Sequence, residues 1–369
     1  MAVRFLALDR LRAVAVLAMV QGHTFTALLR EGAMPRAWAQ LHALFHGLTA
    51  PAFLFGAGLA FGIASYPPDP ELREVHARSG SRLRRYASIF ALGYLLQLPG
   101  GSLLAALRLR GEALVPVLRV GPLQLIAVCL SVCQLLTIVR SRRTQASVCG
   151  ALGLSIAASA PAVYASSLSS AAPAWLGGFI DDRTGSLFPL FPWASFVFVG
   201  VAAAYPLARA GTRPAPWLAA GVLVTATTYA LYRAGYRLSE PQHFWQASPL
   251  NMAFRLGLVS CLLGTLHLSA SPAPLVAAQR TWTALLARHS LVAYVAHLLL
   301  LYGTPLTPSL VRYHARKLEL VETSAVFVLV LSATLLAVYA WSRLHEPRRQ
   351  QRPWVKLAVV GCGVLLLVR

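Results

Sequence analysis

Long apolar stretches alternate with short polar segments along almost the whole chain. About 20 apolar residues are needed for a helix to cross the hydrocarbon core, so each stretch of that length is a candidate span. The pattern predicts spans near residues 11–29, 43–65, 87–104, 120–139, 147–167, 188–207, 216–232, 251–268, 289–306, 322–342 and 354–368. The chain therefore predicts an all-α integral membrane protein, a polytopic bundle of about 10–11 transmembrane helices. Because the loops are short, we expect residues 1–369 to form a single domain.

Composition supports this prediction. Charged residues make up 12% of the chain, about half of the roughly 25% usual in soluble domains. The formal net charge of +21 would suggest nucleic acid in a soluble protein, but here the arginines lie in short loops between apolar stretches. Such a distribution is typical of the positive-inside rule, and it favours a cytoplasmic N-terminus. We therefore expect membrane lipids, and no nucleic acid, as partners.

His23 is the most informative residue, because it lies inside the first apolar stretch. An ionisable side chain at membrane depth costs a few kcal/mol, so it marks a candidate functional site. On a helix, Arg12 and His23 differ by about 20° in azimuth, and Asp9 and His23 by about 40°. The spacing predicts one stripe of Asp9, Arg12, Met19 and His23 that lines the bundle interior or a cavity. It leaves two readings open, a histidine that hydrogen-bonds between helices and a catalytic one.

Two further histidine positions accompany His23. His42 and His46 are four residues apart at the start of the second stretch, a spacing that can bind a metal. Without a neighbouring carboxylate or a third ligand we expect no metal, and we expect His46 to lie at the depth of His23. His297 falls in the middle of the ninth stretch and is a second candidate.

Polar residues also gather near the outer ends of two predicted spans. Asp181 and Asp182 precede the sixth span; such a pair is usually solvated, but a carboxylate here could also orient an imidazole or bind an acceptor. Asn251 and Arg255 share a face of the eighth span. Arg255 either extends to the interface or contacts a polar substrate.

A cluster of arginines lies on the predicted cytoplasmic side. It consists of Arg73, Arg78, Arg82, Arg84 and Arg85. The cluster either determines topology and contacts anionic lipid head groups, or it recognises a phosphorylated cytosolic donor.

Small residues in the apolar stretches predict close packing. Gly58 and Gly62 form a GxxxG pair, which lets another helix approach closely. The five cysteines lack the spacing of a zinc site or a disulfide framework, so we expect them to be buried as small apolar side chains. They are Cys129, Cys133, Cys149, Cys261 and Cys362.

Four segments together resemble the transmembrane acyltransferase superfamily, in particular the catalytic domain of heparan-alpha-glucosaminide N-acetyltransferase and its bacterial relatives. They are Leu8-Asp9-Arg10-Leu11-Arg12-Ala13 with Met19 and Gly22-His23, then Pro51 to Gly58, Leu187 to Trp193, and Ser290 to His297. Ala13 departs from the glycine that the family usually has after the arginine.

The resemblance implies an enzyme of the bacterial inner membrane. Such proteins move an acyl group, often acetyl, from cytosolic acyl-CoA to a hydroxyl or amine of a glycan or glycolipid on the outer side. The family histidine maps onto His23, as a general base or as a transient acyl carrier. The implied donor-binding residues are Asp9, Arg12, Arg82, Arg84 and Arg85. The implied acceptor-binding residues are His46, Asp182, Asn251, Arg255 and His297.

Other functions remain open from the sequence. A multi-span transporter or a lipid-binding membrane protein without catalysis could use the polar stripe as part of a path, although no inverted repeat is evident. A family member that has lost catalysis and serves as a scaffold is a third reading. A homodimer is a possible assembly.

Overall fold

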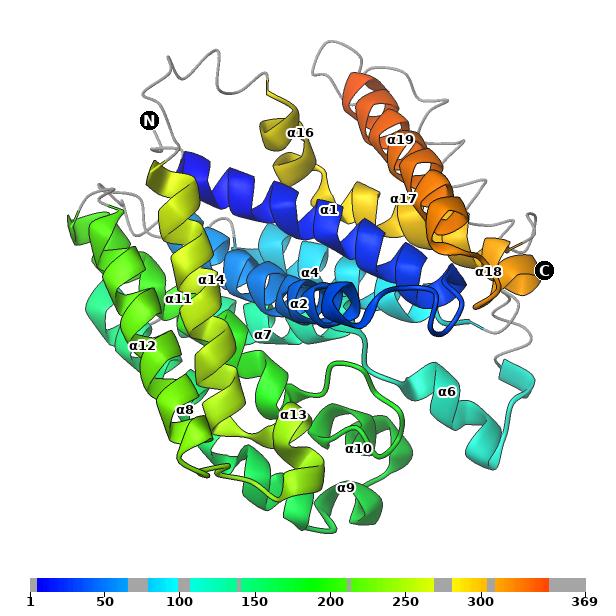
Figure 1. The fold of residues 1–369 in the computed structure, drawn as a ribbon. Helices are drawn as coiled ribbons and strands as arrows, with labels where there is room; N and C mark the ends of the chain where they lie inside the picture. The colour runs from blue at the N-terminus through cyan, green and yellow to red at the C-terminus, as the bar shows by residue number, and fades with distance from the viewer. Residues whose placement is uncertain are drawn as a thin grey trace. The chain divides into compact units, whose positions relative to one another are not determined.

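A computed structural model describes residues 5–65, 79–98, 107–137, 141–210, 214–268, 281–303 and 309–344. These residues are mostly helical and contain no strand, only an isolated parallel bridge between Leu29 and Leu318. Figure 1 shows the helices with their labels.

Six described helices are long and apolar enough to cross a membrane. They are α1 (Leu6–Leu28), α2 (Arg36–Ser65), α8 (Arg142–Ala165), the segment Leu190–Leu207 of α11 (Leu190–Ala210), α14 (Pro249–Leu268) and α19 (Leu320–Leu344). Two bent pairs raise the number within the described ranges to as many as eight. The first joins Gly111–Leu118, which includes α6 (Val115–Leu118), to α7 (Pro122–Leu136), and the second joins α16 (Trp282–Arg288) to α17 (Ser290–Tyr302). The prediction of an all-α polytopic membrane protein is confirmed.

Some predicted spans differ from the helices that form. The third was expected at 87–104, but α4 (Ser79–Leu95) begins earlier, includes three of the clustered arginines and has only 17 residues. The seventh forms α12 (Ala215–Arg233), which has the length of a span but is not one of the six described helices that are both long and apolar enough to cross a membrane. The span expected at 354–368 lies outside the described residues.

The chain divides into two compact units, which are described separately. Unit 1 holds the described residues of 1–8, 51–97 and 109–271, and unit 2 holds those of 9–50, 98–108 and 272–369. One boundary falls inside α2, between Ala50 and Pro51, so this helix contributes to both units. The single acyltransferase-like domain stays a prediction.

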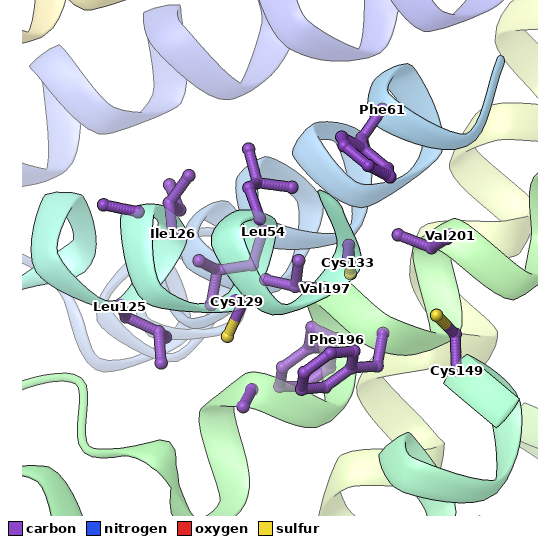
Figure 2. Packing of buried hydrophobic residues seen from close by; sticks show 14 of the residues in the cluster. Leu54, Phe61, Leu125, Ile126, Cys129, Cys133, Cys149, Phe196, Val197 and Val201 are labelled. Carbon is purple, nitrogen blue, oxygen red and sulfur yellow. The ribbon is translucent and has the colours of Figure 1, made fainter. Parts of the chain in front are cut away.

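Unit 1 is built from paired helices around an apolar core. The helix α8 packs against α11, α12 against α14, and α4 against α7, while α11 also contacts α7. Unit 1 also holds short helices, among them α9 (Leu168–Ala171), α10 (Ala174–Ile180) and α13 (Phe244–Ala247). Its core includes Cys129 and Cys133 of α7, Cys149 of α8 and Phe196 of α11 (Figure 2). These three cysteines are free and fully buried, as the sequence predicts, while Cys261 is partly buried and Cys362 lies outside the described residues.

Glycines let α2 and α11 touch at the backbone. A methyl group added at Gly58 would overlap the carbonyl oxygen of Val197, and one at Gly62 would lie 2.5 Å from the Cβ of Ala204. Gly200 of α11 faces the carbonyl of Phe55 in the same way. The close packing predicted from the GxxxG pair is therefore confirmed.

Unit 2 is built around α1, α17 and α19. Val20, Leu28, Leu301 and Val330 from these three helices form a buried apolar cluster, and Figure 1 shows the helices side by side. The helix α18 (Leu310–His314) packs on α17. The end of α1 is tied to the start of α19 by the backbone bond from Arg30 N to Leu318 O (2.8 Å).

Candidate active site: a histidine cluster in unit 2

Two histidines meet at the contact between α1 and α17. The Nδ1 atom of His23 lies 2.9 Å from the Nε2 atom of His297. The centroids of the two rings are 5.1 Å apart, and the interplanar angle is 27°. His297 is 0% exposed, whereas His23 is partly buried. The interior of this unit therefore holds a hydrogen-bonded imidazole pair.

The partners of this pair determine where the hydrogens lie. The Nδ1 atom of His297 is 2.8 Å from the carbonyl oxygen of Ala293. Since a carbonyl oxygen can only accept, Nδ1 of His297 must donate. A neutral imidazole has one N–H, so Nε2 of His297 accepts and Nδ1 of His23 donates. When both rings are neutral, Nε2 of His23 thus bears a lone pair and can take a proton or attack a carbonyl carbon.

A second polar contact joins the same two helices. Arg12 of α1 donates from Nη2 to the Oγ atom of Ser290, the first residue of α17 (2.8 Å). Arg12 and His23 therefore face one neighbour, as the stripe calculated from helical geometry predicts. Both contacts run in the same chain direction, so α1 and α17 are parallel here. Asp9, on the same stripe, is also partly buried.

His46 completes the cluster from α2. Its ring centroid lies 6.3 Å from that of His23, edge to face, which agrees with the predicted common depth of the two histidines and also brings their rings together. The ring covers the backbone of Gly22, because a methyl group added there would lie 2.6 Å from Cε1 of His46 and overlap Nδ1. Only a glycine at this position leaves room for the imidazole in the orientation that it adopts here.

His42 continues the row of rings along α2. It stacks on His46 at 5.9 Å and on Phe25 at 5.7 Å. Nε2 of His42 and Nδ1 of His46 are buried and have no hydrogen-bond partner within the described ranges. In the same ranges no group of three or more His, Cys, Asp or Glu side chains could hold a metal ion.

The candidate donor-binding arginines lie in unit 1, on α4. Arg82 donates to Ser65 Oγ (2.9 Å), to Gln134 Oε1 (3.3 Å) and to the carbonyl oxygen of Ala64 (3.1 Å), so its guanidinium ties α4 to α2 and α7. Arg84 and Arg85 are exposed. Arg73 and Arg78 lie outside the described residues.

The two aspartates after α10 are less exposed to solvent than the sequence indicates. Asp181 is 0% exposed and accepts hydrogen bonds from Ser169 Oγ (2.6 Å) and from the backbone N–H of Arg183 (3.0 Å), so the expectation of a solvated residue is wrong. Asp182 is partly buried. Burial, together with the neighbouring Asp181 carboxylate, raises the pKa of Asp182, and a backbone hydrogen bond and the nearby His243 partly offset this effect.

Asn251 and Arg255 of α14 both point into unit 1. Asn251 is 3% exposed and donates from Nδ2 to the carbonyl oxygen of Trp245 (3.0 Å). The guanidinium of Arg255 lies 5.7 Å from the centre of the Trp193 ring, a cation–π contact with α11. Arg255 is therefore directed toward a neighbouring helix.

Sequence reasoning overlooked three residues that shape these sites. Gly22 makes room for His46, Ser290 accepts a hydrogen bond from Arg12, and His243 lies close enough to Asp182 to influence its carboxyl group. Gly22 and Ser290 lie in the segments that carry the family resemblance. At both places a small residue stands next to a histidine, and this pattern could have indicated that the small residue belongs to the site. His243 had no such signal, because its partner is distant in sequence.

The helices and the buried imidazole pair define a polytopic membrane protein with a candidate site for acid–base or nucleophilic chemistry. A family model described as heparan-alpha-glucosaminide N-acetyltransferase, catalytic, matches residues 4–231. This match spans more than half of the 369 residues, so the chain belongs to that acyltransferase family. No curated protein matches the chain. The matched region includes His23 and His46 and ends before Asn251, Arg255 and His297.

Proposed function

We propose that the protein transfers an acyl group, most simply acetyl, from acyl-CoA to a hydroxyl or amine of a glycan or glycolipid, and that His23 is the reacting residue. The observation that carries this proposal is the hydrogen-bond chain from His23 through His297 to the Ala293 carbonyl, which leaves the lone pair of His23 on Nε2. Membership of the acyltransferase family supports the reaction type.

In the general-base reaction, Nε2 of His23 takes the proton of the acceptor O–H or N–H as the acceptor attacks the thioester carbonyl carbon. The carbon–sulfur bond then breaks. The departing thiolate of CoA recovers the proton from Nε2 of the imidazolium. The same nitrogen thus receives and returns one proton, because Nδ1 of His23 already donates to His297.

In the covalent reaction, Nε2 of His23 attacks the thioester carbon and releases the CoA thiolate. The acceptor then attacks the carbonyl carbon of the acyl-imidazolium, and the bond from that carbon to Nε2 breaks. The acceptor gives its proton to water, which has supplied the proton of the CoA thiol, so the imidazole returns to its neutral form. Both routes need an unprotonated Nε2, and the geometry supports them equally.

Other residues take supporting roles in this proposal. In unit 2, Asp9 and Arg12 support the donor. In unit 1, Arg82 holds its helix in place, and contact of the exposed Arg84 and Arg85 with the coenzyme phosphates stays a prediction. In unit 2 we assign acceptor contact to His46, and acceptor contact by Asp182, Asn251 and Arg255, which belong to unit 1, stays a prediction. The proposed setting is the bacterial inner membrane with a cytoplasmic N-terminus and an outer acceptor.

The test uses purified protein in nanodiscs with acetyl-CoA labelled in the acetyl group. Candidate acceptors are amine-bearing and hydroxyl-only oligosaccharides. We expect labelled acceptor together with an equal amount of free CoA thiol, and loss of both in His23→Ala. A wild-type protein that releases no thiol with any acceptor, while in sealed proteoliposomes it carries a glycan or lipid across the membrane, would establish the transporter alternative instead.

The same assay separates the two routes. Without acceptor, a burst of one thiol per protein and label retained on the protein identify the acyl carrier. Thiol release that strictly requires acceptor identifies the general base.

A further inference from the structure

We propose that His297 is a positioning residue that selects the reactive tautomer of His23, instead of a residue that contacts the acceptor. This inference rests on the proposed function and adds a role to a residue outside the part of the chain that the family model matches.

Both nitrogens of His297 are already engaged. Nδ1 donates to the carbonyl oxygen of Ala293 at 2.8 Å, and Nε2 lies 2.9 Å from Nδ1 of His23. The side chain is 0% exposed, and Tyr294 of the same helix packs against its ring at 5.7 Å. No polar atom of this side chain is left for a substrate.

The Ala293 carbonyl is the fixed end of the chain of hydrogen bonds. It requires a hydrogen on Nδ1 of His297, which makes Nε2 an acceptor. If His23 carried its hydrogen on Nε2, two lone pairs would face each other across 2.9 Å. For two neutral rings, only the tautomer with the hydrogen on Nδ1 of His23 forms the observed contact.

This choice matters because the opposite tautomer would place a hydrogen on Nε2. With a hydrogen on it, Nε2 could neither take the proton of the substrate O–H or N–H group nor attack the thioester carbon. His297 also remains an acceptor when His23 becomes an imidazolium, since Nδ1–H still points at its lone pair. The pair thus supports His23 before and after proton transfer.

The first test measures the tautomer directly and needs no activity. Nitrogen NMR on protein with labelled histidine, with the His23 signals assigned by their absence in His23→Asn, reports which nitrogen carries hydrogen. We expect His23 to be protonated on Nδ1 and not on Nε2. A wild-type signal for hydrogen on Nε2 of His23 would overturn the inference even if the enzyme transfers acetyl groups.

The second test compares two replacements of His297. His297→Gln offers an amide oxygen close to the position of Nε2, whereas His297→Phe fills the space without an acceptor. We expect kcat to fall about 100-fold in His297→Phe with little change in KM for acetyl-CoA, and to be largely restored in His297→Gln. A folded His297→Phe variant that keeps the wild-type kcat would show that His297 only fills space, and equal losses in the two variants would contradict a role for its acceptor nitrogen.

The two tests also separate this inference from the proposed function. If the wild-type protein transfers no acyl group, the proposed acyltransferase function is wrong. The NMR measurement of the His23 tautomer still shows whether His297 positions His23. If His297→Phe fails to fold, the wild-type NMR measurement alone remains decisive.

Discussion

Glycines serve different purposes in the two units. In unit 1, Gly58, Gly62 and Gly200 bring the backbones of α2 and α11 into contact around an apolar core. In unit 2, Gly22 lies under an imidazole, and the helices around it exchange polar contacts through Arg12 and His23. In unit 1 the small residues therefore serve helix packing. In unit 2 the small residue Gly22 makes room for His46 beside His23.

The two kinds of glycine contact predict different effects of substitution on stability and on reaction rate. Overlap with a backbone carbonyl can be relieved only by moving a helix, and closely packed interiors resist such movement. Overlap with the ring of His46 can be relieved by rotating that side chain, which leaves the helices in place. Substitutions in unit 1 should therefore change stability first, and substitutions in the histidine cluster should change rate first.

The largest expected effect follows from disrupting the histidine pair. The double variant His23→Asn/His297→Phe should lose roughly 10²- to 10⁴-fold in kcat, no more than His23→Asn alone, because His297 acts through His23. Steady-state acetyl transfer by both single variants and the double variant measures this coupling. Losses that multiply would mean that His297 contributes independently of His23.

The next largest effect concerns packing in unit 1. Gly58→Ala should destabilise the protein by about 1–3 kcal/mol, because the added methyl overlaps the Val197 carbonyl oxygen. The matched control is Gly150→Ala, whose methyl would meet the Cβ of Ala202 at an ordinary 3.5 Å. Thermal unfolding in nanodiscs gives the comparison, and equal melting temperatures for the two variants would contradict it. The protein that remains folded should keep its transfer rate.

A smaller effect on rate is expected at Gly22. Gly22→Ala forces the His46 ring away from its place beside His23, and we expect roughly tenfold slower transfer at unchanged melting temperature. Gly47→Ala is the control, since nothing lies within 4 Å of a methyl group there. If both variants transfer acetyl at the wild-type rate, His46 has no part in the reaction.

The smallest effect belongs to the ion pair that joins α1 to α19. The hydrogen bond from Arg30 (2.6 Å), and then its charge, hold the pKa of Glu319 below the ordinary value. A lowered carboxyl pKa adds stability above the ordinary glutamate pKa, and this stability is lost as the pH falls through the lowered value. Both side chains are about half exposed (52% and 54%), so solvent screens the pair.

Glu319→Gln should therefore lower the melting temperature only slightly at neutral pH and not at all in acid. Unfolding curves recorded across this pH range provide the measurement. A penalty that persists in acid would show that the side chain stabilises the fold by some means other than its charge.

Helical periodicity predicted much of α1. The positions of Arg12 and His23 on one stripe follow from the helical repeat alone, and both do face α17. The GxxxG pair and the buried cysteines were also predictable, because small apolar residues in a span indicate close packing. Periodicity predicts which face of a helix carries the buried polar residues, but it does not predict which other helix packs against that face.

The remaining features depend on contacts between distant segments. His297 is 274 residues from His23, and no local pattern shows that their nitrogens meet. Asp181 looked solvated because it stands in a polar loop, yet Ser169 and Arg183 bury it. The third span was misplaced because hydropathy excluded the arginines that α4 includes, among them Arg82, whose donors are satisfied by α2 and α7.

The central claim is that Nε2 of His23 performs the transfer, and His23→Asn tests it at the level of one atom. The asparagine side chain can place an N–H near the position of Nδ1 and keep the bond to His297, but it has no equivalent of Nε2. We predict that folded His23→Asn binds acetyl-CoA as the wild type does and transfers acetyl groups roughly 10²- to 10⁴-fold more slowly. Transfer at the wild-type rate by this variant would contradict the account.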